Sequence, residues 1–419
     1  MVAEKKVGCM IFSVGEEFAP LAKCAIDSFK KWHPDVPVHF VNEDNIGSFK
    51  VSTRYPKKMR GHFGIFRFAI AAEIMMTEKY DKFIVLGSDT ITCARMDEFM
   101  DNWTHDILVT LCSSHQLTLP YRVQRSNNFR DDFKVLSTPV LCVAHDRANE
   151  TSNCFHYYGH IEQFQETQRD FDKEGVTLIA SDYLYANSDV LCVNNPAVFL
   201  SILKFASKYW DDFHESREQT EFLTSLGFEF YADQGAINMV AALSLAHQDE
   251  SLIDPQIIST LVGDLKMPMF SISYIEVPFI MATSLYNARA KKSIDEARRD
   301  AAESAHPHAH PECARQEGAS ILKYRVDGDK LFTVDNKQIK VWHYMAHLGL
   351  NTTSQRLGRV NAVSDVDDIE PTKKELAAAK HRFEDIVNSY IFGVFNEETK
   401  KFFKEHCACG TFFEKEFRL

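Results

Sequence analysis

A carboxylate directly follows a buried strand in the segment KFIVLGSDTIT, which spans residues 82–92. The apolar run FIVL predicts a fully buried strand that ends at Gly87. Ser88 and Asp89 follow that strand end, where open α/β sheets bind their ligands. Asp89 is therefore a candidate ligand for a divalent cation, with a turn or helix-cap residue as the plain structural alternative.

Two other segments place polar groups or a glycine at the end of an apolar strand. Ser13 and Gly15 terminate a strand predicted over 7–13, and either a ligand site or a simple turn fits that pattern. His343 ends the short apolar segment KVWH. An imidazole at a strand end could join a carboxylate in binding a metal ion, or it could be a half-buried sheet residue.

Further candidates lie on a strand and on two helices. Asn187 and Asp189 open a strand over 185–194 and, two residues apart, share one face of it. Arg67 lies on an otherwise apolar helix, where a guanidinium could bind phosphate or sugar oxygens through two N–H groups. Asp233 and Gln234 begin another helix, either as a helix cap or as groups that act at a reacting carbon.

The elements that must position these residues alternate between strand and helix. Apolar positions at three- and four-residue steps over 16–33, between strands over 7–13 and 38–41, predict a βαβ unit and a parallel sheet. A helix over 62–79 precedes the strand that ends at Gly87. Further strands are predicted over 107–111, 140–143, 176–180, 185–194, 321–326, 330–334 and 338–344, and a helical segment is predicted from residue 371.

Composition shifts divide the chain into three parts, and the predicted fold class is α/β with a mixed sheet. The core spans 1–290, a polar helix and loop insertion spans 291–318, and hairpin strands with terminal helices span 319–419. The 45% apolar fraction is ample for a packed core. We predict that the third part completes the site, because His343 belongs to it.

Charge and hydropathy restrict the partners and the compartment. With 47 basic and 59 acidic residues, the net charge of −12 argues against broad electrostatic binding to nucleic acid or an anionic membrane. No apolar run approaches the roughly 20 residues of a membrane helix. The polar N-terminus and ten scattered cysteines predict a cytoplasmic protein with free, buried thiols.

Four segments, taken in order, resemble retaining glycosyltransferases of the GT-A fold in family 8, which includes glycogenin and the lipopolysaccharide galactosyltransferases. The matching segments are FRFAIAAE with VLGSDT, then YANSDVLCVN, DQGAIN and KVWH, which begin at residues 66, 85, 185, 233 and 340. The resemblance implies a GT-A sheet that binds a nucleotide diphosphate sugar, a UDP-sugar, and transfers the sugar with retention. The acceptor it implies is a hydroxyl of a glycan or lipid-linked saccharide.

The resemblance also implies roles for individual residues. Asp89 and His343 would hold the metal ion, Mn²⁺ or Mg²⁺, and Asp233 and Gln234 would act at the anomeric carbon. The nucleotide and donor sugar would be bound by Ser13, Gly15, Arg67, Ser88, Asn187 and Asp189.

Three departures mark a divergent branch. Gly87 stands where the family has the first Asp of its Asp-x-Asp motif, and Asp189 stands where the family has Gly. The Lys-Pro-Trp that usually follows the last His is absent, and His347 nearby is a competing ligand.

Alternative functions remain open at the level of sequence. Basic residues over 54–60 could bind the phosphates of hydroxymethylated DNA as an acceptor. The missing acid at Gly87 fits a non-catalytic sugar-nucleotide binder. A sugar nucleotidyltransferase is disfavoured, because its triphosphate chemistry calls for a glycine-rich first loop and this chain has only Gly15 there. The histidine-rich run 306–313 and the pair Cys407 and Cys409 are interpreted as a polar loop and as an isolated motif, respectively.

Overall fold

The computed structural model describes residues 5–14, 18–53, 63–100, 103–111, 138–148, 151–159, 173, 175–182, 186–215, 232–248, 255–262, 268–274, 324–333, 338–343 and 397–409. Several predicted features lie outside these residues: Gly15, His347, the basic segment 54–60, the insertion 291–318 and the helical segment over 371–396.

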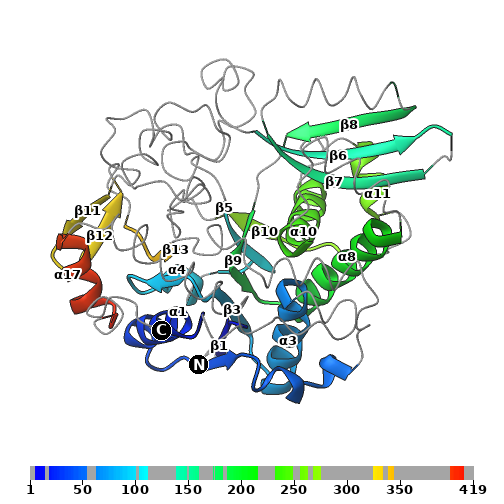
Figure 1. Ribbon diagram of the computed structural model, residues 1–419. Helices are drawn as coiled ribbons and strands as arrows, with labels where there is room; N and C mark the ends of the chain where they lie inside the picture. The colour runs from blue at the N-terminus through cyan, green and yellow to red at the C-terminus, as the bar shows by residue number, and fades with distance from the viewer. Residues whose placement is uncertain are drawn as a thin grey trace, which may run out of the picture.

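A six-stranded mixed sheet forms the centre of the molecule, with strand order β10-β5-β9-β3-β1-β2 (Figure 1). Strands β2, β1 and β3 are parallel to one another, and β10 is parallel to β5. Strand β9 is antiparallel to both of its neighbours, β3 and β5. The sequence-based prediction of a mixed α/β sheet is confirmed. The bounds are β1 (Val7–Phe12), β2 (Val38–Val41), β3 (Lys82–Gly87), β5 (Ile107–Leu111), β9 (Ala186–Val193) and β10 (Ile272–Tyr274).

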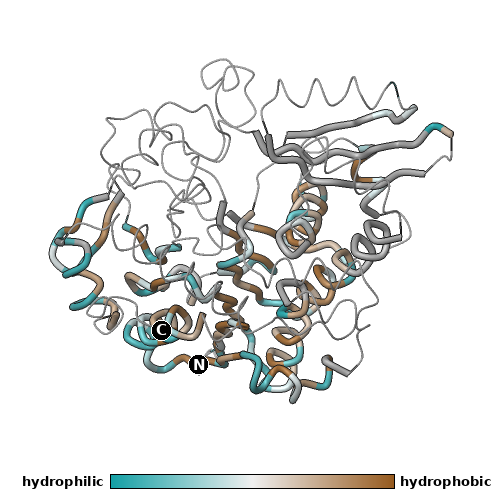
Figure 2. The backbone as a smooth tube through the Cα atoms, viewed as in Figure 1, coloured by the Kyte–Doolittle hydropathy of each residue, from teal (hydrophilic) through white to brown (hydrophobic). Residues whose placement is uncertain are grey.

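Helices cover both faces of this sheet, which explains why its strands read as continuous apolar runs. Cys9 and Ile11 of β1 pack on the face covered by α1 (Ala19–Trp32), whereas Met10 and Phe12 belong to the core on the other face. That second core contains residues of α3 (Phe63–Glu78), α8 (Pro196–Glu215) and α10 (Ala232–Gln248). Figure 2 shows hydrophobic residues along the sheet and the helix flanks that meet it. Within the described residues, no helix combines the length and apolar character needed to cross a bilayer.

Three smaller sheets accompany the central one among the described residues, and one of them is formed by β4 (Thr90–Thr92) and β13 (Val341–His343). Strands β6 (Thr138–Asp146), β7 (Thr151–Gly159) and β8 (Val176–Asp182) form an antiparallel sheet in the order β7-β6-β8 and contact α11 (Pro255–Val262). Strands β11 (Tyr324–Asp327) and β12 (Lys330–Thr333) form the predicted hairpin, with Gly328 at a φ of +60° in its turn. The short helices are η2 (Ile46–Ser48), η3 (Lys50–Thr53) and α4 (Asp97–Met100).

Strand β7 was missed at the sequence level. Its residues, TSNCFHYYG, are largely polar or aromatic and lack the strict apolar alternation that predicts a strand. Two helices also begin at other residues than expected. Helix α1 begins at Ala19, not at Glu16, and α10 begins at Ala232, so that Asp233 lies inside the first turn instead of capping it.

The strand that carries His343 pairs with a distant segment and not with the hairpin. Strand β13 (Val341–His343) is antiparallel to β4 (Thr90–Thr92), which directly follows the turn of Asp89. The prediction of one set of hairpin strands is confirmed in part: among the described residues, an antiparallel bridge between Phe332 and Gln338 links the segment to β12, whereas β13 itself pairs with β4. Long-range pairing of β13 with β4 buries Trp342 completely, which the hairpin alone does not require.

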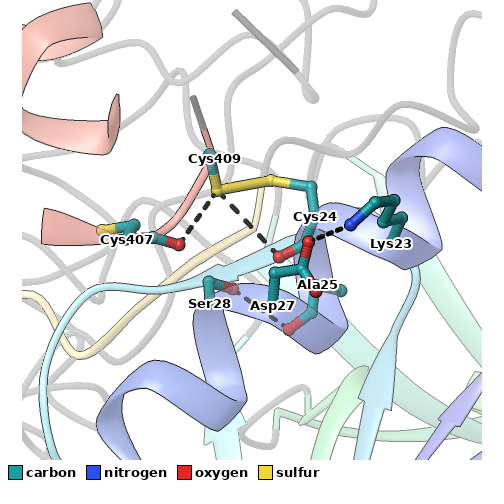
Figure 3. Close-up of polar contacts among 7 residues, drawn as sticks. All are labelled: Lys23, Cys24, Ala25, Asp27, Ser28, Cys407 and Cys409. Atoms are coloured by element: carbon teal, nitrogen blue, oxygen red, sulfur yellow. Dashed lines mark hydrogen bonds and ion pairs between the residues drawn. A yellow bond between two sulfur atoms is a disulfide. The ribbon is translucent and has the colours of Figure 1, made fainter. Parts of the chain in front are cut away.

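A disulfide joins the C-terminal segment to the first helix. Cys24 of α1 is bonded to Cys409, which follows α17 (Glu397–His406), and their Cα atoms are 5.4 Å apart (Figure 3). The expectation of free thiols is therefore wrong for Cys24, and Cys409 does not belong to an isolated motif. Burial raises the pKa of the free thiols of Cys9 and Cys192 well above its usual value, which makes them poor nucleophiles.

Candidate metal centre

The turn after β3 places Asp89 at the carboxyl end of the central sheet. Gly87 ends the strand, and the hydroxyl of Thr90 donates a hydrogen bond of 2.8 Å to the Gly87 carbonyl oxygen. Thr90 then begins β4. This tight turn holds the Asp89 side chain in a buried position.

Strand β13 brings His343 to the same turn. The β4–β13 register places His343 opposite Thr90, the residue after Asp89. His343 is fully buried, and its Nε2 lies 3.4 Å from Oδ2 of Asp89. The structure thus brings together the two residues that the sequence predicted as metal ligands.

A second carboxylate reaches the cluster from β9. The antiparallel register pairs Leu86 with Val190, so that Gly87 and Asp189 are the next residues along and face each other. Oδ2 of Asp189 lies 3.4 Å from His343 Nε2. Asp189 was predicted to bind the donor sugar, and that contact stays a prediction; the structure places its carboxylate beside the candidate metal ligands.

These three side chains have the chemistry and the spacing of a divalent-cation site. One ligand atom from each of Asp89, Asp189 and His343 lies within 4.8 Å of the other two. Oxygens and an imidazole suit Mn²⁺ and Mg²⁺, and ligands about 2.1 Å from such an ion are separated by about 3 Å at right angles. The two 3.4 Å separations agree with ligands grouped around one ion. The cluster could therefore hold a metal ion.

Arg67 binds one of these carboxylates from the opposite side. Its Nη1 donates to Oδ1 of Asp189 at 3.1 Å, and its Nη2 donates to the carbonyl oxygen of Ser188 at 2.9 Å. The Arg67 side chain is 6% exposed, so this ion pair is screened little by water. The sequence predicted that Arg67 binds the donor, and that contact stays a prediction. What the structure adds is that Arg67 fixes Asp189.

The remaining predicted site residues lie on the elements that meet here. Ser13 follows β1, whose Phe12 pairs with Gly87, so that Ser13 and Ser88 lie at the same sheet edge as Asp89. The Ser13 side chain is buried, and its backbone N–H donates to the Val41 carbonyl oxygen at 2.9 Å. Ser88 is half-buried.

Three other predicted residues have described backbones, although their side chains lie outside the described part of the structure. Asn187 lies in β9, and Asp233 and Gln234 lie in the first turn of α10. Asn238 on the same helix forms two hydrogen bonds with the backbone of Ala186, one to its N–H at 2.7 Å and one to its carbonyl oxygen at 2.9 Å. This amide fixes α10 against the start of β9 and thereby sets where its first turn lies.

Comparisons with known proteins give structural neighbours alone. No family model matches the sequence, and no curated protein matches it. The chain is similar to the apo structure of the bifunctional glycosyltransferase WbbM, with a TM-score of 0.35 and 11% identity over 90% of this chain. It spans about half of that protein, 52% of its length.

Two structures of LgtC are also similar to this chain. An active-site mutant gives a TM-score of 0.29 at 12% identity, covering 89% of this chain and 99% of LgtC. The galactosyltransferase LgtC in complex with donor and acceptor sugar analogs gives 0.27 at 11%, covering 88% and 99%. All three neighbours are glycosyltransferases, the class that the four sequence segments resemble. These scores and identities are low, and the function proposed below is inferred from the geometry of the site.

Proposed function

We propose that this protein is a GT-A glycosyltransferase that moves a sugar from a nucleotide diphosphate sugar to a hydroxyl acceptor. The observation that carries the proposal is the cluster of buried Asp89, half-buried Asp189 and buried His343 at the carboxyl edge of the central sheet. Nucleotide ligands of open α/β sheets bind at this edge. A metal ion held here would supply neutralising charge to the diphosphate leaving group.

The residues at this edge of the sheet would have different roles in the reaction. Asp89 and Asp189 provide two negative charges and His343 an imidazole, a set that balances a divalent ion. Ser13 and Ser88, at the same edge, would bind the nucleotide and its phosphates. We propose that residues 1–290 and 319–419 form one catalytic unit. The pairing of β13 with β4 supports this.

The donor, the stereochemistry and the acceptor are the finer parts of the proposal. We propose a UDP-sugar donor, retention of configuration, Mn²⁺ or Mg²⁺ as the ion and a saccharide hydroxyl as the acceptor. The missing acid at Gly87 was the reason for considering a non-catalytic sugar-nucleotide binder. Because Asp189 supplies a second carboxylate beside Gly87, this reason no longer favours that alternative. The cytoplasmic location predicted from free thiols forms no part of the proposal, since Cys24 and Cys409 are bonded.

A donor screen tests this function directly. The protein with Mn²⁺ is incubated with a panel of UDP- and GDP-sugars, with and without saccharide acceptors, and the products are identified by mass spectrometry. Hydrolysis of, or transfer from, one donor is the expected result. Nucleotide binding without turnover on the whole panel would contradict the proposal.

Asp233→Asn tests the proposed catalytic part of α10. We expect turnover to fall by about 10²-fold, because a group that acts on charge or protons at the reacting centre contributes about that much. The donor Kd should change less than threefold, which is about 0.7 kcal/mol, against about 2.7 kcal/mol for the fall in turnover. If donor binding falls and turnover of bound donor does not, Asp233 has a structural role.

A further inference from the structure

Gly87 and Asp189 occupy facing positions on β3 and β9. Side chains at facing positions of an antiparallel pair lie on the same side of the sheet, usually with Cβ atoms about 5 Å apart, and these two positions approach more closely than that. A Cβ atom added at Gly87 would lie 2.8 Å from Oδ1 and 2.9 Å from Cβ of Asp189, and also 2.9 Å from Oδ1 of Asp89. A Cβ atom is essentially never found this close to a non-bonded heavy atom, so the pair of positions has room for one carboxylate side chain.

Backbone conformation does not explain the glycine. The described glycines with positive φ are Gly175 and Gly328, and Gly87 is not among them. Gly87 is an ordinary strand residue whose backbone any amino acid could adopt. The requirement at position 87 is therefore space, which is filled by the side chain of Asp189 together with Oδ1 of Asp89.

The two oxygens of Asp189 have different partners. Oδ1 accepts from Arg67 Nη1 at 3.1 Å, while Oδ2 lies 3.4 Å from His343 Nε2. The second arm of the guanidinium is held by the Ser188 carbonyl oxygen, one residue earlier on the same strand. A guanidinium that donates both to Oδ1 and to the neighbouring backbone carbonyl restrains Oδ1, and Oδ2 is then the oxygen directed at the cluster.

We propose that Asp189 is a metal ligand supplied by β9 in place of a side chain at position 87, and that Arg67 is its positioning residue. This inference rests on the proposed function, in that it assigns the ligands of the same site. The alternative is a purely structural Arg67–Asp189 ion pair. In that case, neutralising the Asp189 carboxylate would leave the metal affinity unaffected.

Binding of Mn²⁺ alone, followed by electron paramagnetic resonance in the absence of donor, tests the ligand assignment. Asp189→Asn should lower Mn²⁺ affinity at least tenfold, and Gly87→Ala should do so too by displacing the carboxylate; loss of a supporting contact in a metal site commonly costs about 10- to 100-fold. Folding is monitored by thermal unfolding of each variant. Wild-type affinity in folded Asp189→Asn would overturn the proposal.

Moving the carboxylate across the strand pair is the sharper test. Gly87→Asp combined with Asp189→Gly keeps one carboxylate in the same space, and we expect Mn²⁺ affinity above that of Asp189→Gly alone. No gain in a folded double variant would overturn the exchange. If the double variant does not fold, the Asp189→Asn and Gly87→Ala results decide.

Arg67 is tested by the same metal titration. Arg67→Met should weaken Mn²⁺ binding about tenfold and alter the resonance spectrum of the bound ion, with partial rescue in Arg67→Lys. Arg95→Met is the matched control, because Arg95 pairs with Asp97 at 2.9 Å on the exposed surface. Equal Mn²⁺ affinity for Arg67→Met and Arg95→Met would overturn the positioning role.

Measuring both Mn²⁺ binding and sugar transfer distinguishes a failure of the ligand assignment from a failure of the proposed function. Weak Mn²⁺ binding by Asp189→Asn, together with a wild type that transfers no sugar, would support this ligand set and contradict the enzyme. Sugar transfer with Mn²⁺ affinity unchanged in Asp189→Asn would support the enzyme and contradict this ligand set.

Discussion

Adjacent residues of β13 face two different environments. His343 points into the acidic cluster with Asp89 and Asp189. Trp342 packs edge-to-face on Phe403 of α17, with ring centroids 5.8 Å apart. We call α17 and the Cys24–Cys409 disulfide behind it the C-terminal clasp.

The two sides of β13 contribute to the protein in opposite ways. Crowding two buried carboxylates costs folding free energy unless a cation compensates, and Arg67 compensates for one of them. The clasp buries aromatic rings and adds a covalent link, both of which stabilise the fold. The stabilising contacts of the clasp on one side of β13 thus offset the cost of the crowded carboxylates on its other side, an arrangement suited to binding a cation.

Asp89→Ala should produce the largest effect and should act on activity alone. A metal ion contributes several kcal/mol of charge stabilisation, which corresponds to a fall in turnover of about 10³-fold. The melting temperature should stay the same or rise, because one of two crowded carboxylates is removed. Turnover within tenfold of wild type would show that Asp89 does not serve the metal site.

Cys24→Ser should give the converse result. Loss of the clasp disulfide should lower the free energy of unfolding by about 3 kcal/mol, while the folded protein keeps its Mn²⁺ affinity within about twofold. Urea titration with and without dithiothreitol measures this. The reductant should destabilise the wild type and leave the variant unchanged. Equal urea midpoints without reductant would contradict a stabilising clasp.

Acidification should lower the free energy of unfolding by a smaller amount, through His33 at the end of α1. His33, at the end of α1, accepts a hydrogen bond from the Met96 N–H at 3.2 Å, and burial lowers its pKa to about 4. Between this value and the unfolded pKa near 6.5, the unfolded chain binds a proton that the folded chain does not. Stability should therefore fall as the pH decreases through that window, by roughly 2 kcal/mol.

A glutamine at this position is the control for the pH effect. His33→Gln keeps an acceptor for Met96 and does not titrate, so its stability should depend less on pH between 6.5 and 4. The measurement is urea unfolding at several pH values. Identical pH slopes for the variant and the wild type would assign the effect to other groups.

The sequence predicted well those elements whose pattern is local. The FIVL run identified β3, and the three- and four-residue spacing of apolar residues identified α1 and α3. It also pointed to Asp89 and His343, because both stand at the end of a buried strand; the structure places them 3.4 Å apart, and their role as metal ligands stays a prediction. These features depend on backbone geometry and burial over a few residues, which a local pattern can express.

Pairings between distant segments were decided by the tertiary structure. The antiparallel pairing of β9 with β3 places Asp189 opposite Gly87, and β13 pairs with β4 and not with the hairpin. The sequence contained the missing acid at Gly87 and the extra acid at Asp189 as two separate departures. Their connection is a matter of register across strands, which depends on the packing of both sheet faces and which neither segment specifies alone.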